Sequence, residues 1–423
     1  MTAPWTLERA EDHLLGLELF GMRFGLDRMR RLMTVLGSPE RAFTSIHVVG
    51  TNGKSSTVRM IEELLRRHRV RTGSYTSPHL VSFAERIRID GHEISPSAFA
   101  AAVQRAAHAA ELVERTLPDD EGVTQFEVLT TAAYSELAIA GVETAVVEAG
   151  LGGRFDATSV IPARVHVLTN VGLDHTRWLG PTVIDIAREK LAVVRDGGTL
   201  VVGELQPEVE AEARAVAERH GARLVQAPAE IAGLAVAAPG AYQRRNFALA
   251  ATATEAFLGR LDPSAVAAAA ASVRIPGRCE VVDHDPLTIV DGAHNPAGVR
   301  ALVASLPELR GEGAPGGLVA VVSVLEDKDA AGMLRELLPC CAAVVLTSNA
   351  NPRALPPATL QSLARQVARD DDPPPMEVVT DPRAAVRRGR ELAGPDGVVL
   401  ATGSIYLVAD LARAGPARRA STL

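Results

Sequence analysis

The chain has 423 residues, of which 47% are hydrophobic, 22% charged and 4% aromatic. This balance is that of a folded globular protein, so it excludes intrinsic disorder and collagen-like repetition, and the length allows two to four domains. The net charge of −7 argues against a general nucleic-acid binder, which would carry a basic excess. Three cysteines without CxxC spacing favour a reducing compartment.

The start of the chain lacks the basic-then-apolar order of a signal peptide, and no apolar stretch reaches membrane-spanning length. We therefore expect a cytoplasmic protein that does not bind membranes. Among the 44 basic residues, only Lys54, Lys190 and Lys328 are lysines, which leaves 44 − 3 = 41 arginines. A chain this rich in arginine keeps lysine by accident or where a primary amine is needed, so these positions are the first candidates for function.

The N-terminal part alternates between helical and strand patterns. Residues 7–36 carry apolar side chains at helical spacing and predict two helices. Residues 46–49 are a short apolar run that ends at Gly50, and residues 55–69 predict the helix that follows. Later apolar runs, separated by helical stretches, predict buried parallel strands at 144–147, 165–169 and 199–202.

A second series of strands begins after an acidic Asp-His-Asp-Pro stretch at 283–286. Its members are predicted at 287–290, 318–322, 343–346, 376–379 and 398–401, with helical patterns between them. We therefore predict an α/β protein of two domains, residues 1–283 and 284–423, of which the second is smaller and doubly wound.

The segment Gly50–Ser56 follows a strand and opens a helix. Backbone N–H groups at such a helix end can surround phosphate oxygens, and Lys54 can reach the outer phosphates. The strict P-loop pattern fails because Val48 stands where its first glycine belongs. The alternative is an ordinary glycine turn capped by Ser55, although the strand–loop–helix context and the rare lysine favour a phosphate site.

Polar side chains also follow two other predicted strands. Glu148 ends one strand beside a glycine-rich loop, where a carboxylate can hold a hard cation against phosphates; the alternative is a simple pair with Arg154. Asp174 and His175 follow another strand, although a lone histidine is more often structural than a ligand. Because parallel strands present their carboxyl ends at one edge, a chance grouping of Lys54, Glu148 and His175 is less favoured.

The other two lysines and one further loop complete the candidates. Lys190 lies on a predicted helix, where the alternative is a solvated neighbourhood with Asp185 at poor pairing distance. Asn295 before Pro296 is a good helix N-cap, which leaves Asp291 and His294 unexplained. Lys328 follows a strand of the second domain, and a solvated loop lysine explains it equally well.

Together these motifs resemble the folylpolyglutamate synthase/dihydrofolate synthase family, a branch of the Mur ligases. The likeness runs in order over most of the chain, through segments 50–56, 76–80, 148–156, 172–176, 188–190, 291–296 and 402–404. It implies a P-loop-type N-terminal ATPase domain with a parallel sheet, a smaller Rossmann-like C-terminal domain, and an active site in the cleft between them. Two departures stand out: Ser55 replaces a glycine found in many relatives, and segment 16–19 matches the family's pterin segment poorly.

The resemblance also implies roles for individual residues. The ATP-binding set would be Gly50, Thr51, Asn52, Gly53, Lys54, Ser55, Ser56, Asn246, Arg278 and Asp291. Two Mg²⁺ ions would be held, one by Ser77 and Glu148 and one by Glu148 and His175, with Lys190 carried as a carbamate that helps hold metal. The pterin-bearing substrate would contact Thr124, Gln125, Phe126, Phe155, Asp156 and Ala157, while His294 and Ser404 would lie towards glutamate.

The implied reaction is an ATP-dependent amide ligation. A substrate carboxylate attacks the γ-phosphate of ATP to give an acyl phosphate, and the amine of L-glutamate then displaces phosphate. Such chemistry needs positioning and charge neutralisation, which Lys54 and Mg²⁺ provide. The resemblance makes Lys54, Lys190 and His294 the expected catalytic residues. The substrate would be a folate, dihydropteroate or both, the partners are small molecules, and we expect a monomer. The alternatives are a Mur-type ligase for another carboxylate and a nucleotide-binding regulatory protein without ligation.

Overall fold

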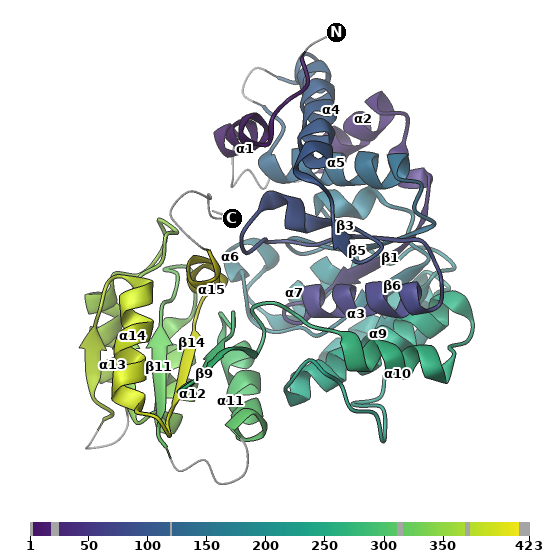
Figure 1. The fold of residues 1–423 in the computed structure, drawn as a ribbon. Coiled ribbons are helices and arrows are strands. Elements are labelled where there is room, and N and C mark those ends of the chain that lie inside the picture. Colours follow the sequence, from purple (N-terminus) through teal and green to yellow (C-terminus); the bar gives the residue numbers. More distant parts are fainter. Residues whose placement is uncertain (1–2, 18–24, 119–120, 311–315, 369–372, 414–423) are drawn as a thin grey trace.

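The strands of the described residues form two separate sheets, one in each half of the chain (Figure 1). The computed structural model describes residues 3–17, 25–118, 121–310, 316–368 and 373–413. Each sheet is covered by helices on both faces, so the predicted α/β class with two units is confirmed. Within the described ranges, no helix combines the length and the apolar character needed to cross a membrane.

The first sheet has the strand order β4-β3-β2-β5-β1-β6-β7-β8. Its six strands from β2 to β8 in that order run parallel, and β3 and β4 add an antiparallel edge. The strands are β1 (Thr44–Val49), β2 (Thr72–Tyr75), β3 (Ile87–Ile89), β4 (His92–Glu93), β5 (Thr144–Glu148), β6 (Val165–Leu168), β7 (Thr199–Val202) and β8 (Arg223–Gln226). Parallel strands buried on both faces read as continuous apolar runs, which is why the sequence predicted β1, β5, β6 and β7. The strands β2, β3, β4 and β8 carry polar residues, and the sequence did not predict them.

Helices cover the two faces of this sheet as separate apolar layers (Figure 1). On one side lie α1 (Leu7–Gly16), α2 (Asp27–Val35), α4 (Pro96–Glu114) and α5 (Gln125–Ile139), with α7 (Val183–Leu191) and α8 (Pro207–Arg219) over β6 and β7. On the other side lie α3 (Lys54–Arg67), α9 (Ala241–Leu258) and α10 (Pro263–Ser272). The single-turn α6 (Thr176–Leu179) follows β6, and its Leu179 packs into the same apolar layer as α7 and α8.

The second sheet has the order β13-β12-β11-β14-β10-β9, with only β9 antiparallel. Its strands are β9 (Glu280–His284), β10 (Leu287–Val290), β11 (Leu318–Val322), β12 (Ala343–Leu346), β13 (Met376–Val378) and β14 (Val398–Thr402). One face packs against α11 (Pro296–Arg310), α12 (Ala330–Leu337) and α13 (Pro357–Val367), and the other against α14 (Pro382–Ala393) and α15 (Ile405–Ala412). The strand order reverses around β14, which is where such sheets form their binding crevice.

The second sheet takes in residues that precede the predicted division of the chain. β9 pairs with β10 in the second sheet and begins at Glu280, so this sheet starts before residue 284. We therefore propose that the boundary lies between α10 and β9, a few residues earlier than the sequence indicates. The acidic stretch at 283–286 is the hairpin between β9 and β10 rather than an interdomain linker.

Candidate active site

A cavity of about 1350 Å³ lies between the two domains and is lined by residues from both. It is bounded by the carboxyl ends of β1, β5 and β6 and by the loops that follow β10, β11 and β14. The predicted residues that line it are Thr51, Asn52, Gly53, Lys54, Ser55, Ser56, Ser77, Thr124, Phe126, Glu148, Phe155, Asp156, Ala157, His175, Asn246, Arg278, Asp291, His294 and Ser404. Gly50, Gln125 and Lys190 are not among the lining residues.

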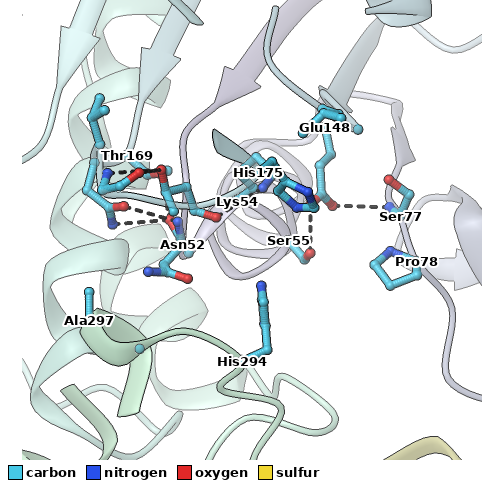
Figure 2. Close-up of a pocket in the computed structure, with 18 of the residues that line it drawn as sticks. Asn52, Lys54, Ser55, Ser77, Pro78, Glu148, Thr169, His175, His294 and Ala297 are labelled. Atoms are coloured by element: carbon cyan, nitrogen blue, oxygen red, sulfur yellow. Dashed lines mark hydrogen bonds between the residues drawn. The ribbon is translucent and has the colours of Figure 1, made fainter. Parts of the chain in front are cut away.

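The loop between β1 and α3 is fixed by the strand next to it. The backbone N–H of Thr51 donates to the Asn170 carbonyl oxygen at 3.0 Å, and that of Asn52 donates to Asn170 Oδ1 at 3.0 Å. Thr169 Oγ1 in turn donates to the Asn52 carbonyl at 2.6 Å (Figure 2). Because the amides of Thr51 and Asn52 already donate to Asn170, they do not point at a phosphate. The backbone amides at the start of α3 are therefore the ones that can bind phosphate.

Two glycines in this loop are required by backbone geometry and close packing. Gly50 has φ +152° and Gly53 has φ +82°. A Cβ on Gly50 would lie 1.8 Å from Thr169 Oγ1, and one on Gly53 would lie 2.6 Å from Asn246 Oδ1. The loop is thus clamped between β6 and α9, which places Lys54 at the first position of α3 and its side chain in the cavity.

Glu148 ends β5 with a buried carboxylate that faces the phosphate loop. Ser55 Oγ donates to Glu148 Oε1 at 2.9 Å, and the Ser77 backbone N–H donates to Oε2 at 3.2 Å (Figure 2). Burial raises the pKa of Glu148, against the opposing effect of the Lys54 charge. The alternative partner Arg154 pairs with Glu189 instead, at 3.1 Å. Ser55 therefore supplies a hydroxyl beside this carboxylate.

Lys190 lies behind the phosphate loop rather than in solvent. Its Nζ donates to the Gly50 carbonyl at 2.9 Å, and the residue is only 4% exposed. Burial, with the nearby Lys54 charge, lowers the pKa of Lys190 to about 7. The expected alternative, a solvated neighbourhood with Asp185, is wrong, because Asp185 accepts the hydroxyl hydrogen bond of Thr182 at the start of α7.

His175 and Asp174 follow β6 at the same edge of the sheet. His175 has φ +50° and stands at the N-cap of α6, and Figure 2 shows its ring beside Glu148 and Lys54. Burial lowers the pKa of His175 to about 4. The Asp174 carboxylate acts to raise this pKa and the Lys328 charge acts to lower it. The ring is therefore neutral at neutral pH. Burial acts to raise the pKa of Asp174, but a hydrogen bond from His294 and the surrounding positive charges outweigh it and hold the pKa far below its usual value.

The second domain contributes the loop between β10 and α11. Asn295 Oδ1 accepts from the Gly298 backbone N–H at 2.8 Å, so the predicted N-cap with Pro296 as the first helical residue is confirmed. His294 Nδ1 donates to the Gly292 carbonyl at 3.0 Å, because a carbonyl oxygen only accepts, and this fixes the ring with Nε2 towards Asp174. Figure 2 shows the His294 side chain pointing towards the side chains of the phosphate loop.

Asp291 is held by groups from both domains. Its Oδ2 accepts from the Cys279 backbone N–H and from the Tyr242 hydroxyl, each at 2.8 Å, and its Oδ1 accepts from the Ala293 backbone N–H at 2.7 Å. Tyr242 belongs to α9 of the first domain, so this carboxylate joins α9 to the second sheet. Cys279 takes φ +45° in this arrangement, and the preceding Arg278 lines the cavity.

The opposite end of the cavity is formed by α5 and the loop after β5. Thr124 caps α5 in a capping box with Glu127, and the Phe126 ring stacks on Tyr75 with centroids 6.3 Å apart. Asp156 is buried and accepts from the backbone N–H groups of Leu151 and Thr158. Gln125 instead donates to the Leu14 carbonyl at 2.7 Å, so it ties α5 to α1 and does not face the cavity.

The poorly matching segment 16–19 ends partly outside the described residues. Gly16 is the last residue of α1 and Leu17 its C-cap, whereas positions 18 and 19 belong to the range 18–24 that is not described.

The structure corrects the interpretation of Lys328 as a solvated loop residue. Its side chain is 7% exposed, and Nζ lies 2.7 Å from Oδ1 of Asp174 in the first domain. Its Nζ also lies 3.3 Å from His175 Nε2. The sequence did not indicate Tyr242 as a functional residue, and it gave no role to Asp174 or Asn170. Lys328 was marked in the sequence only by the scarcity of lysine.

The predicted metal-binding residues are only partly assembled. In the part of the chain that the structure describes, no three or more His, Cys, Asp and Glu side chains group in a way that could hold a metal ion. Glu148 nevertheless presents a buried carboxylate with the hydroxyl of Ser55 against it and Ser77 beside it, and oxygen donors of this kind suit Mg²⁺. The donor set around Glu148 therefore fits a divalent cation bound together with phosphates.

Two α/β domains enclose a cavity with a phosphate loop on one wall, which is the arrangement expected of a Mur-type ligase. Residues 277–405 match the family described as "Mur ligase, glutamate ligase domain". This match covers the second sheet from before β9 to the start of α15.

The chain belongs to the dihydrofolate synthase/folylpolyglutamate synthase family. It is 39% identical over 369 residues to the dihydrofolate synthase/folylpolyglutamate synthase of Mycobacterium tuberculosis, covering 78% of this chain and 75% of that protein. It is similar to the solved M. tuberculosis folylpolyglutamate synthase complexed with ADP and AMPPCP, with TM-score 0.86, 34% identity and 96% and 97% of the chains covered. A bifunctional folylpolyglutamate synthase/dihydrofolate synthase with Mn, AMPPNP and L-glutamate bound is also similar, with TM-score 0.83, 29% identity and 97% and 98% covered.

Proposed function

We propose that this protein is an ATP-dependent ligase that forms an amide between L-glutamate and a carboxylate of a folate, of dihydropteroate, or of both. The observation that carries this proposal is the cavity between the domains, which has Lys54 and Glu148 on one wall and His294 and Ser404 on the other. Its family membership supports the same reaction class, and the ligands in the titles of similar structures, namely nucleotides and L-glutamate, support the substrates.

The proposed reaction has two steps, which this chain supports by charge and position. In the first, a carboxylate oxygen of the pterin-bearing substrate attacks the γ-phosphorus of ATP, and the bond to ADP breaks. In the second, the amine of L-glutamate attacks the acyl carbon, phosphate leaves and the amine loses a proton. Lys54 at the start of α3 and Arg278 on the facing wall neutralise the charge that builds up on the transferred group.

Glu148, Ser55, Ser77 and His175 are the residues that would hold Mg²⁺ beside the phosphates. When bound, the ion supplies neutralisation of phosphate charge and orientation of the transferred group. The Glu148 carboxylate is the only charged donor of this set, and it is already aimed by Ser55 and by the Ser77 backbone. The neutral ring of His175 suits a ligand role, because a protonated imidazole has no lone pair to donate.

Lys190 is proposed to react with CO₂ to form a carbamate. The reaction forms an N–C bond at Nζ and releases a proton, so it needs the neutral amine. A pKa of about 7 makes that form abundant at neutral pH, and burial behind Gly50 keeps the adduct from exchange with bulk water. Arginine cannot make this adduct, which explains why lysine is kept in a chain that otherwise prefers arginine.

The end of the cavity near α5 is proposed to take the pterin-bearing substrate. Phe126 and Phe155 offer apolar ring surface there, and Thr124, Asp156 and Ala157 line the same region. His294 and Ser404 are proposed to lie towards the incoming glutamate, because they stand at the carboxyl ends of β10 and β14, where α/β sheets bind ligands.

A single assay tests the function and separates its substrates. Pure protein is incubated with ATP, Mg²⁺ and L-glutamate, and with either dihydropteroate or tetrahydrofolate, while phosphate release and the glutamylated product are measured. Product with either pterin supports the proposal and assigns the substrate. Phosphate release with a muramyl precursor but with neither pterin would overturn the folate assignment, and nucleotide binding without any product would favour a regulatory protein.

A further inference from the structure

The carboxylate of Asp174 lies at the centre of a polar cluster that joins the two domains beside the cavity. Asp174 follows β6 of the first domain, and its side chain is 7% exposed. Three of its contacts come from the second domain: Lys328 Nζ at 2.7 Å from Oδ1, Asn295 Nδ2 at 3.2 Å from Oδ2, and His294 Nε2 at 3.5 Å from Oδ2. One buried carboxylate thus gathers two separate loops of the second domain.

The same cluster reaches the phosphate loop through a pair of amides. Asn52 Nδ2 donates to Asn295 Oδ1 at 3.1 Å, and Asn295 Nδ2 donates to Asn52 Oδ1 at 2.9 Å. Asn52 is itself fixed to β6 by the Asn170 and Thr169 contacts. Asn295 therefore contacts both the phosphate loop and Asp174 while it caps α11.

The loop that carries Lys328 is held by hydrogen bonds of its own. The Lys328 backbone N–H donates to the Leu325 carbonyl at 3.2 Å, and its carbonyl accepts from Ala330 at 2.8 Å. The next residue, Asp329, caps α12 by accepting from the Gly332 backbone N–H at 2.8 Å. Both partners of the Asp174–Lys328 pair are 7% exposed, so removing one partner leaves a buried charge uncompensated, unlike at a surface pair.

We propose that Asp174, Lys328 and Asn295 form an interdomain clasp, and that Lys328 is a positioning residue that holds the second domain against the phosphate loop. The clasp places His294 and Ser404 opposite the substrate carboxylate, which is phosphorylated beside Lys54. Its kinetic consequence rests on the proposed function, whereas its structural consequence does not.

Hydrogen–deuterium exchange on the free protein tests the clasp without any substrate. In Lys328→Met and in Asp174→Asn, the amides of Thr51 and Asn52 should exchange at least threefold faster, because the second domain no longer holds their loop. Amides within β11 and β14 should keep their rates. Arg388→Met is the matched control, because it removes an ion pair with Glu377 at 2.7 Å inside the second domain, and it should leave the phosphate loop unchanged.

Kinetics give the second arm of the test. Lys328→Met should raise KM for L-glutamate and lower kcat, together reducing kcat/KM at least tenfold, while the Kd for ADP changes less than threefold. The double variant with Asp174→Asn should be no worse than the more damaged single variant, because each single substitution already breaks the ion pair between Asp174 and Lys328. If Lys328→Met does not fold, Lys328→Arg keeps the charge at a tight site and should show intermediate exchange and activity.

Unchanged exchange at Thr51 and Asn52 in Lys328→Met, or single-variant losses that simply add in the double variant, would overturn the clasp. A wild-type protein that shows no ligation while the exchange results hold would overturn the proposed function and leave the clasp standing.

Discussion

At the scale of single residues, Lys54 carries the most specific expectation. Lys54 is the first residue of α3, and its side chain lines the cavity. Its ammonium group donates to the Thr51 carbonyl at 3.2 Å. Replacing Lys54 by methionine keeps an unbranched side chain, one heavy atom shorter, and removes the charge. We expect Lys54→Met to lose about 10²- to 10³-fold in kcat/KM, as for one charge-stabilising donor, measured by phosphate release. Thermal unfolding checks that the variant is folded, and a loss below about threefold would remove Lys54 from the reaction.

The amine of Lys190 predicts a pH-dependent modification. Burial, with the Lys54 charge, lowers its pKa to about 7, so the reactive neutral amine dominates above pH 7 and is lost as the pH falls through 7. With ¹³C-labelled bicarbonate, NMR should show a carbamate signal that is stronger at pH 8 than at pH 6. Lys190→Arg supplies the control, since arginine forms no carbamate. Equal spectra for wild type and Lys190→Arg at pH 8 would show that the carbamate proposal is wrong.

At the scale of elements, a comparison of Gly53, in the turn before α3, with Gly37 distinguishes the cost of backbone strain from the cost of close packing. Gly53 and Gly37 have similar positive φ angles, +82° and +78°, but only Gly53 lacks room for a Cβ, because Asn246 Oδ1 would lie 2.6 Å away. We expect Gly37→Ala to cost about 1 kcal/mol from the left-handed backbone alone. Gly53→Ala should cost more in urea unfolding and also weaken ADP binding, since α9 and the loop must move apart. Equal costs for the two variants would contradict this close approach.

A pair of buried histidines in the centre of the first sheet predicts acid sensitivity. His47 on β1 and His166 on β6 are register partners and each is 1% exposed. Burial, with smaller effects from nearby positive groups, lowers the pKa of His47 to about 3 and that of His166 to about 4. The unfolded chain binds protons below about pH 6.5 while the folded sheet does not, so stability is present above pH 6.5 and is lost as the pH falls towards 4.

Removing one of these histidines should flatten that dependence. Between pH 7 and pH 5, wild type should lose roughly 2 kcal/mol more unfolding free energy than His166→Leu, which corresponds to about 1.5 pH units below the unfolded pKa. Urea unfolding at the two pH values measures the difference. Parallel loss of stability in wild type and His166→Leu would show that this histidine does not stay neutral in the fold.

At the scale of the whole molecule, contacts between the domains differ in what they do. Tyr242 and Arg244 both lie on α9 and both reach the second domain, the first to Asp291 at 2.8 Å and the second to Glu308 at 2.8 Å. The Tyr242 contact orients a buried carboxylate at the cavity, whereas the Arg244 pair is exposed on the outside. We expect Tyr242→Phe to weaken ADP binding about fivefold, the loss of one hydrogen bond. Arg244→Gln should change ADP affinity little, and equal effects of both variants by calorimetry would contradict the distinction.

Much of this architecture was readable from the sequence. Runs such as residues 145–147 and 398–401 are apolar at every position because their strands are buried on both faces, so local composition reports the sheet directly. The helix N-cap at Asn295 followed from local side-chain chemistry in the same way. The end of the first domain was less readable, because the pairing of β9 with β10 depends on a hairpin and not on a composition change.

For the site, the sequence by itself determined which residue types stand at the ends of strands: Lys54 after β1, Glu148 at the end of β5 and His175 after β6. It also marked Lys190 and Lys328 through the scarcity of lysine. Only the tertiary structure decided their partners. Lys190 donates to Gly50, 140 residues away, and Lys328 pairs with Asp174, 154 residues away. No local pattern encodes such contacts, because they arise when two separately packed sheets bring their carboxyl edges together around one cavity.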